Sequence, residues 1–100
     1  MKSKWIRLPQ ECEGSYMFSG KIFTSSRVNL LLSKNELAEI LFDVRTFVKE
    51  NYGVDYLIVY QHQITKQKLF FIDQLNREMI ASGEFKSKFN HATLILSEEY

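Results

Sequence analysis

The stretch Leu32-Ser33-Lys34-Asn35-Glu36-Leu37 marks the start of a long helix. Ser33 and Glu36 have the spacing of a capping box, in which each side chain accepts a hydrogen bond from the backbone N–H of the other residue. Leu32 and Leu37 flank this pair at the two positions of a hydrophobic staple. We therefore predict that a helix begins directly after Ser33.

Apolar residues continue from this start with the period of a helix. They lie at positions i, i+3, i+4, i+7, i+10 and i+11, and they are Leu37, Ile40, Leu41, Val44, Phe47 and Val48. A helix that binds a partner would show the same stripe, but the strand-like segments that follow favour a core helix. Gly53 stands where a left-handed residue would end the helix, so we expect the helix to span about residues 34–52.

Segments rich in aromatic and β-branched residues predict the strands. The first is Ser15–Ser25, in which Gly20 marks either a bulge or a hairpin tip between two short strands. The others are 54–64, 68–73 and 91–96. A short polar segment separates 54–64 from 68–73 and predicts a hairpin. The run Leu30–Leu32 leads into the helix, and its three leucines are expected to be largely buried. Residues 74–82 could extend the preceding strand or form a helical turn, which they fit slightly better, and Gly83 would end either element.

These elements predict an α+β fold, with one long helix (about 34–52) packed on an antiparallel sheet of four to five strands. We expect residues 15–100 to form a single α+β domain that follows an N-terminal arm of residues 1–14. The two central strands are apolar on both faces, whereas one helix covers only one face of a sheet. The second face is therefore expected to be covered by the arm, by the 74–90 connection or by another chain.

Composition narrows the class of protein. The chain has 100 residues, of which 45% are hydrophobic, as in a globular domain. No apolar run approaches the roughly 20 residues of a membrane span, and no apolar segment follows the N-terminal lysines as in a secretory signal. Cys12 is the only cysteine, which favours a reducing, cytoplasmic setting. A net charge of +1 gives no general attraction to nucleic acid or membranes.

No pattern of reactive side chains indicates catalysis. The candidate metal ligands Cys12, His62 and His91 lie in three separate segments without the spacing of a metal site. The four glycines are dispersed, so no phosphate-binding loop is expected, and no serine has the context of a nucleophile. We therefore predict no catalytic residue, no metal and no cofactor, and favour a protein that is not an enzyme.

Asp73 is the one carboxylate that allows two interpretations. It ends an apolar strand, so it could point inward, with a raised pKa or with a partner such as Arg77 or a tyrosine. The more ordinary interpretation, which we favour, is a strand-end residue that caps the following turn. An enzyme that uses Asp73 and neighbouring tyrosines ranks last among the functions considered.

A nucleic-acid-binding surface is the alternative to a protein-binding one. Aromatic residues that could stack on bases stand near lysines in the sequence, and the residues concerned are Tyr56, Tyr60, Phe70, Lys66, Lys68, Lys86 and Lys88. The near-neutral charge and the absence of an aromatic–basic motif argue against this alternative. The candidate partner-binding residues, whatever the partner, are Tyr56, Tyr60, His62, Phe70, Asp73 and Arg77.

From Gly20 onward the chain resembles a family of small uncharacterised proteins of bacterial plasmids and other mobile elements, a domain of unknown function. The likeness is carried by Gly20-Lys21-Ile22-Phe23-Thr24, Leu69-Phe70-Phe71-Ile72-Asp73 and Thr93-Leu94-Ile95-Leu96-Ser97-Glu98-Glu99-Tyr100. Gln74 and Leu75 stand where that family typically has tyrosines, and its histidine- and glycine-containing loop is missing. The resemblance implies no activity, but it implies an accessory protein of a phage or plasmid.

These observations together predict a cytoplasmic, non-enzymatic protein-interaction module. We expect the partner to be another protein, with a second copy of the chain as one form of that partner, bound through an uncovered sheet face or the flank of the helix. As an accessory protein of a mobile element, it would inhibit or modulate a host system, which is an inference by analogy alone. A single-stranded nucleic-acid binder is the alternative, and no membrane is expected as partner.

Overall fold

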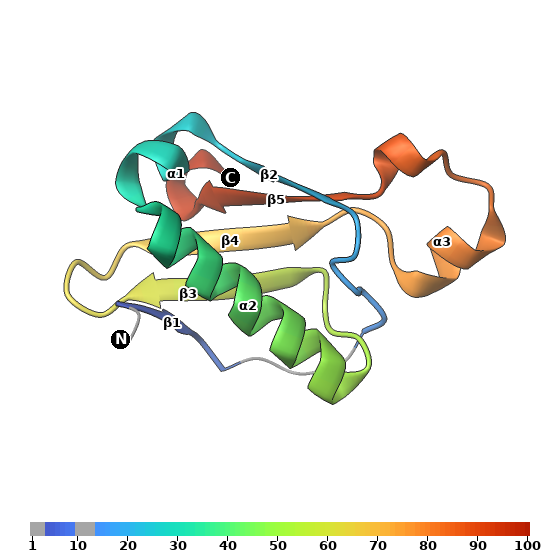
Figure 1. Ribbon diagram of the computed structural model, residues 1–100, viewed down its shortest axis with the longest axis horizontal. Coiled ribbons are helices and arrows are strands. Elements are labelled where there is room, and N and C mark those ends of the chain that lie inside the picture. Colours follow the sequence, from blue (N-terminus) through green and yellow to red (C-terminus); the bar gives the residue numbers. More distant parts are fainter. Residues whose placement is uncertain (1–3, 10–13) are drawn as a thin grey trace.

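The computed structural model describes residues 4–9 and 14–100 of the chain, so Cys12 lies outside the described residues. The elements, in chain order, are β1 (Trp5–Arg7), β2 (Lys21–Thr24), α1 (Ser26–Leu31), α2 (Lys34–Asn51), β3 (Leu57–His62), β4 (Lys68–Asp73), α3 (Arg77–Ser82), the 3-10 turn η1 (Ser87–Phe89), β5 (His91–Leu96) and the 3-10 turn η2 (Ser97–Glu99). The fold is α+β, as predicted, with one long helix on a five-stranded sheet (Figure 1).

The start of α2 confirms the predicted capping box. Ser33 Oγ accepts a hydrogen bond from the Glu36 N–H at 3.1 Å, and Glu36 Oε1 accepts one from the Ser33 N–H at 3.0 Å. The end of α2 differs from the prediction, because the left-handed cap is Tyr52, with φ 51° and ψ 44°, one residue before Gly53. The Gly53 N–H then donates to the Val48 carbonyl at 3.1 Å and closes the helix.

The sheet has the strand order β1-β3-β4-β5-β2. Its centre, β3-β4-β5, is the antiparallel run that was predicted. The prediction of a wholly antiparallel sheet is wrong at one edge, because β2 pairs parallel with β5. The two strands are far apart in sequence, so the direction of β2 depends on the path of the chain through both helices rather than on a turn.

The main core lies between α2 and one face of the sheet. The predicted stripe of α2 faces inward, with Ile40, Val44, Phe47 and Val48 buried. Alternate residues of the central strands meet it, and they are Ile58, Tyr60, Leu69, Phe71, Ala92, Leu94 and Leu96. Phe42, which lies off the stripe, is 73% exposed.

The prediction for the leucine run before α2 is wrong for two of its three residues. Leu30 is 88% exposed and Leu31 is 40% exposed, whereas Leu32 is buried. The reason is that Leu30 and Leu31 belong to the short helix α1, in which only residues three or four apart share a face. Val28 and Leu32 are four residues apart and both are buried in the core, whereas Leu31, three residues after Val28, is only partly turned toward it.

Two predicted strands are shorter than expected. Of Ser15–Ser25 only Lys21–Thr24 is a strand, and Tyr16 forms isolated bridges to Val54 and Asn76. The strand expected over 54–64 is Leu57–His62, followed by the predicted hairpin into β4. The strand predicted over 91–96 has those bounds.

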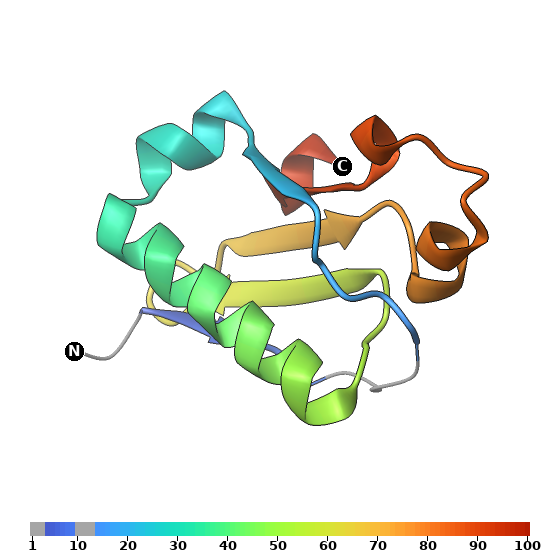
Figure 2. The same cartoon turned by 45° about the vertical axis from the view of Figure 1, so that its right-hand side comes forward.

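Among the described residues, no α-helix or strand lies over the face of the sheet opposite α2, and only the C-terminal turn η2 brings a side chain, that of Tyr100, against it. The arm contributes β1, which pairs with β3 as an edge strand instead of crossing this face. Helices α1 and α2 lie on the other side, and the 74–90 connection extends beyond one end of the sheet (Figures 1 and 2). Neither the described part of the arm nor the 74–90 connection therefore lies over this face.

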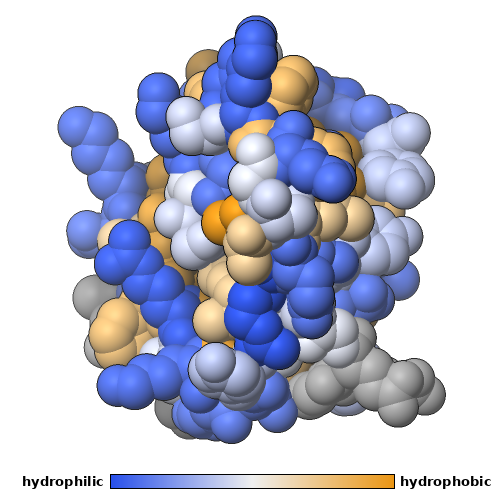
Figure 3. Space-filling view, turned by 90° about the vertical axis from the view of Figure 1, so that its right-hand side faces the viewer, coloured by the Kyte–Doolittle hydropathy of each residue, from blue (hydrophilic) through white to orange (hydrophobic). Residues whose placement is uncertain are grey.

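The 74–90 connection contains the predicted helical turn. It forms α3, which ends at Gly83 in a left-handed conformation with φ 73°. Phe85 and Phe89 are 44% and 47% exposed. Seen from this end, the molecule is largely hydrophilic and the hydrophobic colour is confined to small areas (Figure 3). Among the described residues, no helix has both the length and the apolar character that crossing a membrane requires.

Candidate functional site

The six residues predicted to bind a partner do not form one site. Tyr60 and Asp73 point into the core, and Phe70 points to the opposite face of the sheet. Tyr56 and His62 lie just before the start and at the end of β3, and Arg77 begins α3. Tyr60 was grouped with Tyr56 and His62 because they alternate along one strand, but the face that Tyr60 occupies is the buried one.

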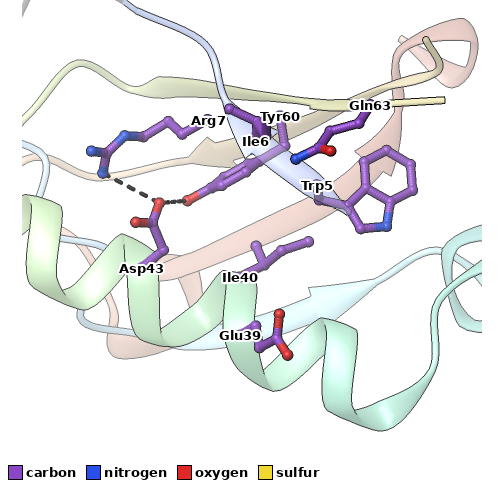
Figure 4. A pocket seen from close by; sticks show the side chains of 8 residues that line it. All are labelled: Trp5, Ile6, Arg7, Glu39, Ile40, Asp43, Tyr60 and Gln63. Carbon is purple, nitrogen blue, oxygen red and sulfur yellow. Dashed lines mark hydrogen bonds and ion pairs between the residues drawn. The ribbon is translucent and has the colours of Figure 1, made fainter. Parts of the chain in front are cut away.

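Tyr60 belongs to a cluster that joins β1, β3 and α2 (Figure 4). Its hydroxyl donates to Asp43 Oδ2 at 2.6 Å, and Arg7 Nη1 lies 3.3 Å from the same oxygen. Burial, then the hydrogen bond and charge of Asp43, raise the pKa of Tyr60 above its ordinary value. Tyr60 is therefore a neutral donor to the Asp43 carboxylate.

A pocket of about 520 Å³ lies beside this cluster, between β1 and α2. It is lined by Trp5, Ile6, Arg7, Glu39, Ile40, Asp43, Tyr60 and Gln63 (Figure 4). The Arg7 guanidinium also packs on the ring of Phe47, at 3.8 Å from the ring centroid, and its contact with Asp43 is an ion pair without hydrogen-bond geometry. Arg7, Asp43 and Tyr60, which line the pocket, already contact one another. We therefore interpret these contacts as structural, because they hold β1 and β3 to α2.

Tyr60→Phe is expected to lower the free energy of unfolding by about 1.5–3 kcal/mol, because it removes a hydrogen bond to a charged group. Tyr56→Phe is the matched control, since Tyr56 is 40% exposed, and its effect should stay within about 0.5 kcal/mol. Urea denaturation of both variants measures the difference. Equal effects would show that the hydroxyl of Tyr60 contributes nothing beyond that of an exposed tyrosine.

Asp73 combines the two interpretations that the sequence allowed. It is only 3% exposed, and it also caps the turn after β4, because Oδ1 accepts from the Gln74 N–H at 2.9 Å. Its Oδ2 accepts from the N–H of Phe18, at 2.8 Å. Burial raises the pKa of the Asp73 carboxyl, although the hydrogen bonds from Phe18 and Gln74 act in the opposite direction. Both oxygens bind backbone N–H groups rather than Arg77 or a tyrosine.

Arg77 and His62 also hold local structure together. The Arg77 guanidinium donates to the Tyr52 carbonyl at 2.9 Å and packs on the Tyr52 ring, which ties α3 to the end of α2. His62 Nδ1 accepts from the N–H groups of Ile64 and Thr65 in the hairpin turn. Among residues 4–9 and 14–100, no group of three or more metal-binding side chains is arranged to hold a metal ion.

Phe70 is the one predicted residue that lies on the uncovered side of the sheet. It stands in a cross-strand row with Val59 and Ile95. A second row contains Leu57, Ile72, Thr93 and Phe23. We call these seven residues the open face.

The open face is apolar at its centre and charged only toward its ends. Lys68 and Lys21, at opposite ends of the sheet, are the charged strand residues that point to this side. Phe23 is 51% exposed, and Ile6 extends the apolar surface onto β1 with 48% of its surface exposed. The ring of Tyr100 lies 5.5 Å from that of Phe70 and packs on it edge-on. An exposed apolar surface with charged residues at its ends is a candidate interaction site.

Prediction from the sequence missed most of the open face. The pattern of apolar residues in the central strands showed that both faces are apolar. It did not show which set of alternate residues faces the helix. Val59, Ile72 and Ile95 are half-buried and apolar, so each was indistinguishable from a core residue. Compared with known proteins, the chain shows no significant match to a protein-family model, a curated protein or a solved structure.

Proposed function

We propose that this protein is a non-enzymatic protein-interaction module and that a second copy of the chain binds to its open face. One observation carries the proposal: two apolar cross-strand rows lie on a side of the sheet that no described helix or strand covers. Burying them in a dimer would remove apolar surface from water, at about 25 cal/mol per Å². Two sheets can pack face to face at about 10 Å with their side chains interdigitated.

The size of the face supports a second copy as the occupant. Five strands at a spacing of about 4.8 Å, with about 3.3 Å per residue, give a surface of roughly 24 by 20 Å, or about 500 Å² in projection. Stable interfaces bury about 800 Å² per partner. The exposed side chains at the rim, Ile6, Phe23 and Tyr100, would supply much of the remaining area.

Two further observations support a cellular location and a biological role for this module. A single cysteine supports a reducing, cytoplasmic location. The resemblance to proteins of bacterial mobile elements supports a role as an accessory protein that modulates a host system.

We expect sedimentation equilibrium to show a species of twice the 11.8 kDa of one chain, in concentration-dependent exchange with monomer. Phe70→Glu places a charge at the centre of the open face and should raise the dissociation constant at least about 100-fold, since an unpaired buried charge is costly. Ile80→Glu is the matched control, because Ile80 is 40% exposed on α3, away from the face, and dimerisation should be unchanged.

A wild-type chain that remains monomeric at high concentration would refute the dimer. The nucleic-acid alternative has its own test, which is the binding of labelled single-stranded DNA at low salt, where phosphate contacts are strongest. Tight binding that is lost on replacing Lys66 and Lys68 or Lys86 and Lys88 by alanine would favour that alternative.

A further inference from the structure

Strand β2 has an edge with no strand beyond it. The Lys21 N–H donates to the Asn90 carbonyl at 3.2 Å, and the Ser25 N–H donates to the Leu94 carbonyl at 3.1 Å. In a parallel pair, the backbone N–H and C=O groups of alternate residues bond to the neighbouring strand, and the backbone groups of the residues between them point to the opposite side. The backbone N–H and C=O groups of Ile22 and Thr24 therefore point to the open side of β2.

A groove of about 510 Å³ lies between this end of β2 and the second half of α2. It is lined by Met17, Phe18, Ser19, Gly20, Ile22, Arg45, Val48, Lys49 and Tyr52. The charged residues among them are both cations, Arg45 and Lys49. Neither forms an ion pair with another described residue. The groove thus combines apolar side chains with two cations that no described acidic residue pairs with.

A second hollow, also about 510 Å³, lies against Ser19 and Gly20 and shares these two residues with the groove. Its charged lining residues are again cations, Lys21 and Lys88, and Ser87 and Asn90 complete it. Four cations therefore surround the N-terminal end of β2. By contrast, the pocket between α2 and β1 has both signs of charge, because Arg7 lines it together with Glu39 and Asp43. The net charge of +1 therefore does not show that cations gather at this end of β2.

We infer that the edge of β2 binds an extended acidic segment of a partner protein. The segment would pair antiparallel with β2, through the backbone groups of Ile22 and Thr24. In such a pair, directly opposed residues have their side chains on the same face. Ile22 points toward the groove, so a glutamate opposite Ile22 would extend toward Arg45 and Lys49. This site is separate from the open face and does not depend on its occupant.

The charges favour an acidic segment over the other occupants. Pairing β2 with β2 of a second copy would bring the four cations of each chain toward those of the other, and like charges across an interface are costly. Single-stranded nucleic acid would satisfy the cations, but it lacks the strand backbone that would pair with Ile22 and Thr24. An acidic peptide satisfies both features.

The test is the anisotropy of a labelled eight-residue peptide of alternating glutamate and valine. We expect binding that weakens as salt rises from about 50 to 300 mM, because surface charge pairs are screened. Arg45→Glu and Lys49→Glu should each weaken binding at least tenfold. Lys66→Glu, in the β3–β4 turn, is the matched control and should change it less than twofold. A peptide of alternating lysine and valine should not bind.

Backbone pairing is tested separately from charge. Ile22→Pro removes an N–H that points away from β5 and should weaken binding at least tenfold, with folding checked by circular dichroism. Peptides methylated on backbone nitrogen test the same bonds without altering the protein: methylation of the glutamates should abolish binding, and methylation of the valines should not. The inference would be overturned if both methylated peptides bound as tightly as the unmodified peptide. It would also be overturned if single-stranded DNA bound as tightly as the peptide and Ile22→Pro did not weaken the binding of DNA.

Discussion

Asp73→Ala is expected to lower the free energy of unfolding by about 1–3 kcal/mol at neutral pH. The carboxylate accepts from the backbone N–H groups of Phe18 and Gln74. The substitution leaves the buried Phe18 N–H without this acceptor, whereas the Gln74 N–H still donates to the His91 carbonyl at 3.2 Å. An unsatisfied buried donor costs about 1–3 kcal/mol. Phe18 also has a positive φ of 50°, so its conformation depends on this contact. Asp73→Asn keeps one acceptor and should cost about half as much. Urea denaturation measures both.

The cost of Asp73→Ala should depend on pH in a defined direction. Burial raises the pKa of Asp73 in the folded state, so between the unfolded and the folded pKa the folded state binds more protons. The part of this contribution that depends on the proton of Asp73 is therefore complete below the unfolded value of about 3.9 and is lost as pH rises through the folded pKa. The hydrogen bonds that its oxygens accept remain at neutral pH. The difference in stability between wild type and Asp73→Ala should be larger at pH 4 than at pH 7. A difference that grows with rising pH would contradict the raised pKa.

Gly20→Ala is expected to lower the free energy of unfolding by about 3 kcal/mol, at the upper end of overpacking effects. A Cβ atom at Gly20 would lie 2.0 Å from the carbonyl oxygen of Asn90, which is backbone and cannot rotate away. The start of β2 must therefore move from β5, and the hydrogen bond from the Lys21 N–H to Asn90 should be lost. Hydrogen exchange at Lys21, together with urea denaturation, measures both effects.

Gly83→Ala is the matched control for this substitution. A Cβ atom at Gly83 would meet nothing within 4 Å, and only the left-handed backbone, with φ +73°, opposes it. The expected cost is about 1 kcal/mol. If the two variants were equally stable, the close approach of Gly20 to Asn90 would have no role in attaching β2 to the sheet.

Elements that are specified by residues close together in the sequence were predicted well. The capping pair Ser33 and Glu36 and the apolar stripe of α2 depend only on residues within one or two turns of one another, and the structure confirms both. The hairpin of β3 and β4 likewise depends on a short polar turn between two apolar strands. Leu30 and Leu31 show the limit, since an apolar run predicts burial only if the element containing it is known.

The candidate site could be predicted only in part. Of the residues named as partner-binding, Phe70 lies on the uncovered side and Tyr60 lies on the buried side, because both strand faces are apolar and the alternation alone does not identify the inner one. The four cations around the end of β2 come from three segments of the chain, 19–22, 45–49 and 86–90, so no local charge pattern reveals them. In the net charge of the whole chain, these four positive charges are offset by acidic residues in other segments.

The sequence by itself determined the fold class, the long helix and the central antiparallel strands, because capping, periodicity and turn formation depend on residues that are neighbours in the chain. Only the tertiary structure decided the parallel pairing of β2 with β5, the place of the arm at the sheet edge, and the absence of a described helix or strand over the open face. These features depend on contacts between distant segments, whose direction and packing no local pattern encodes.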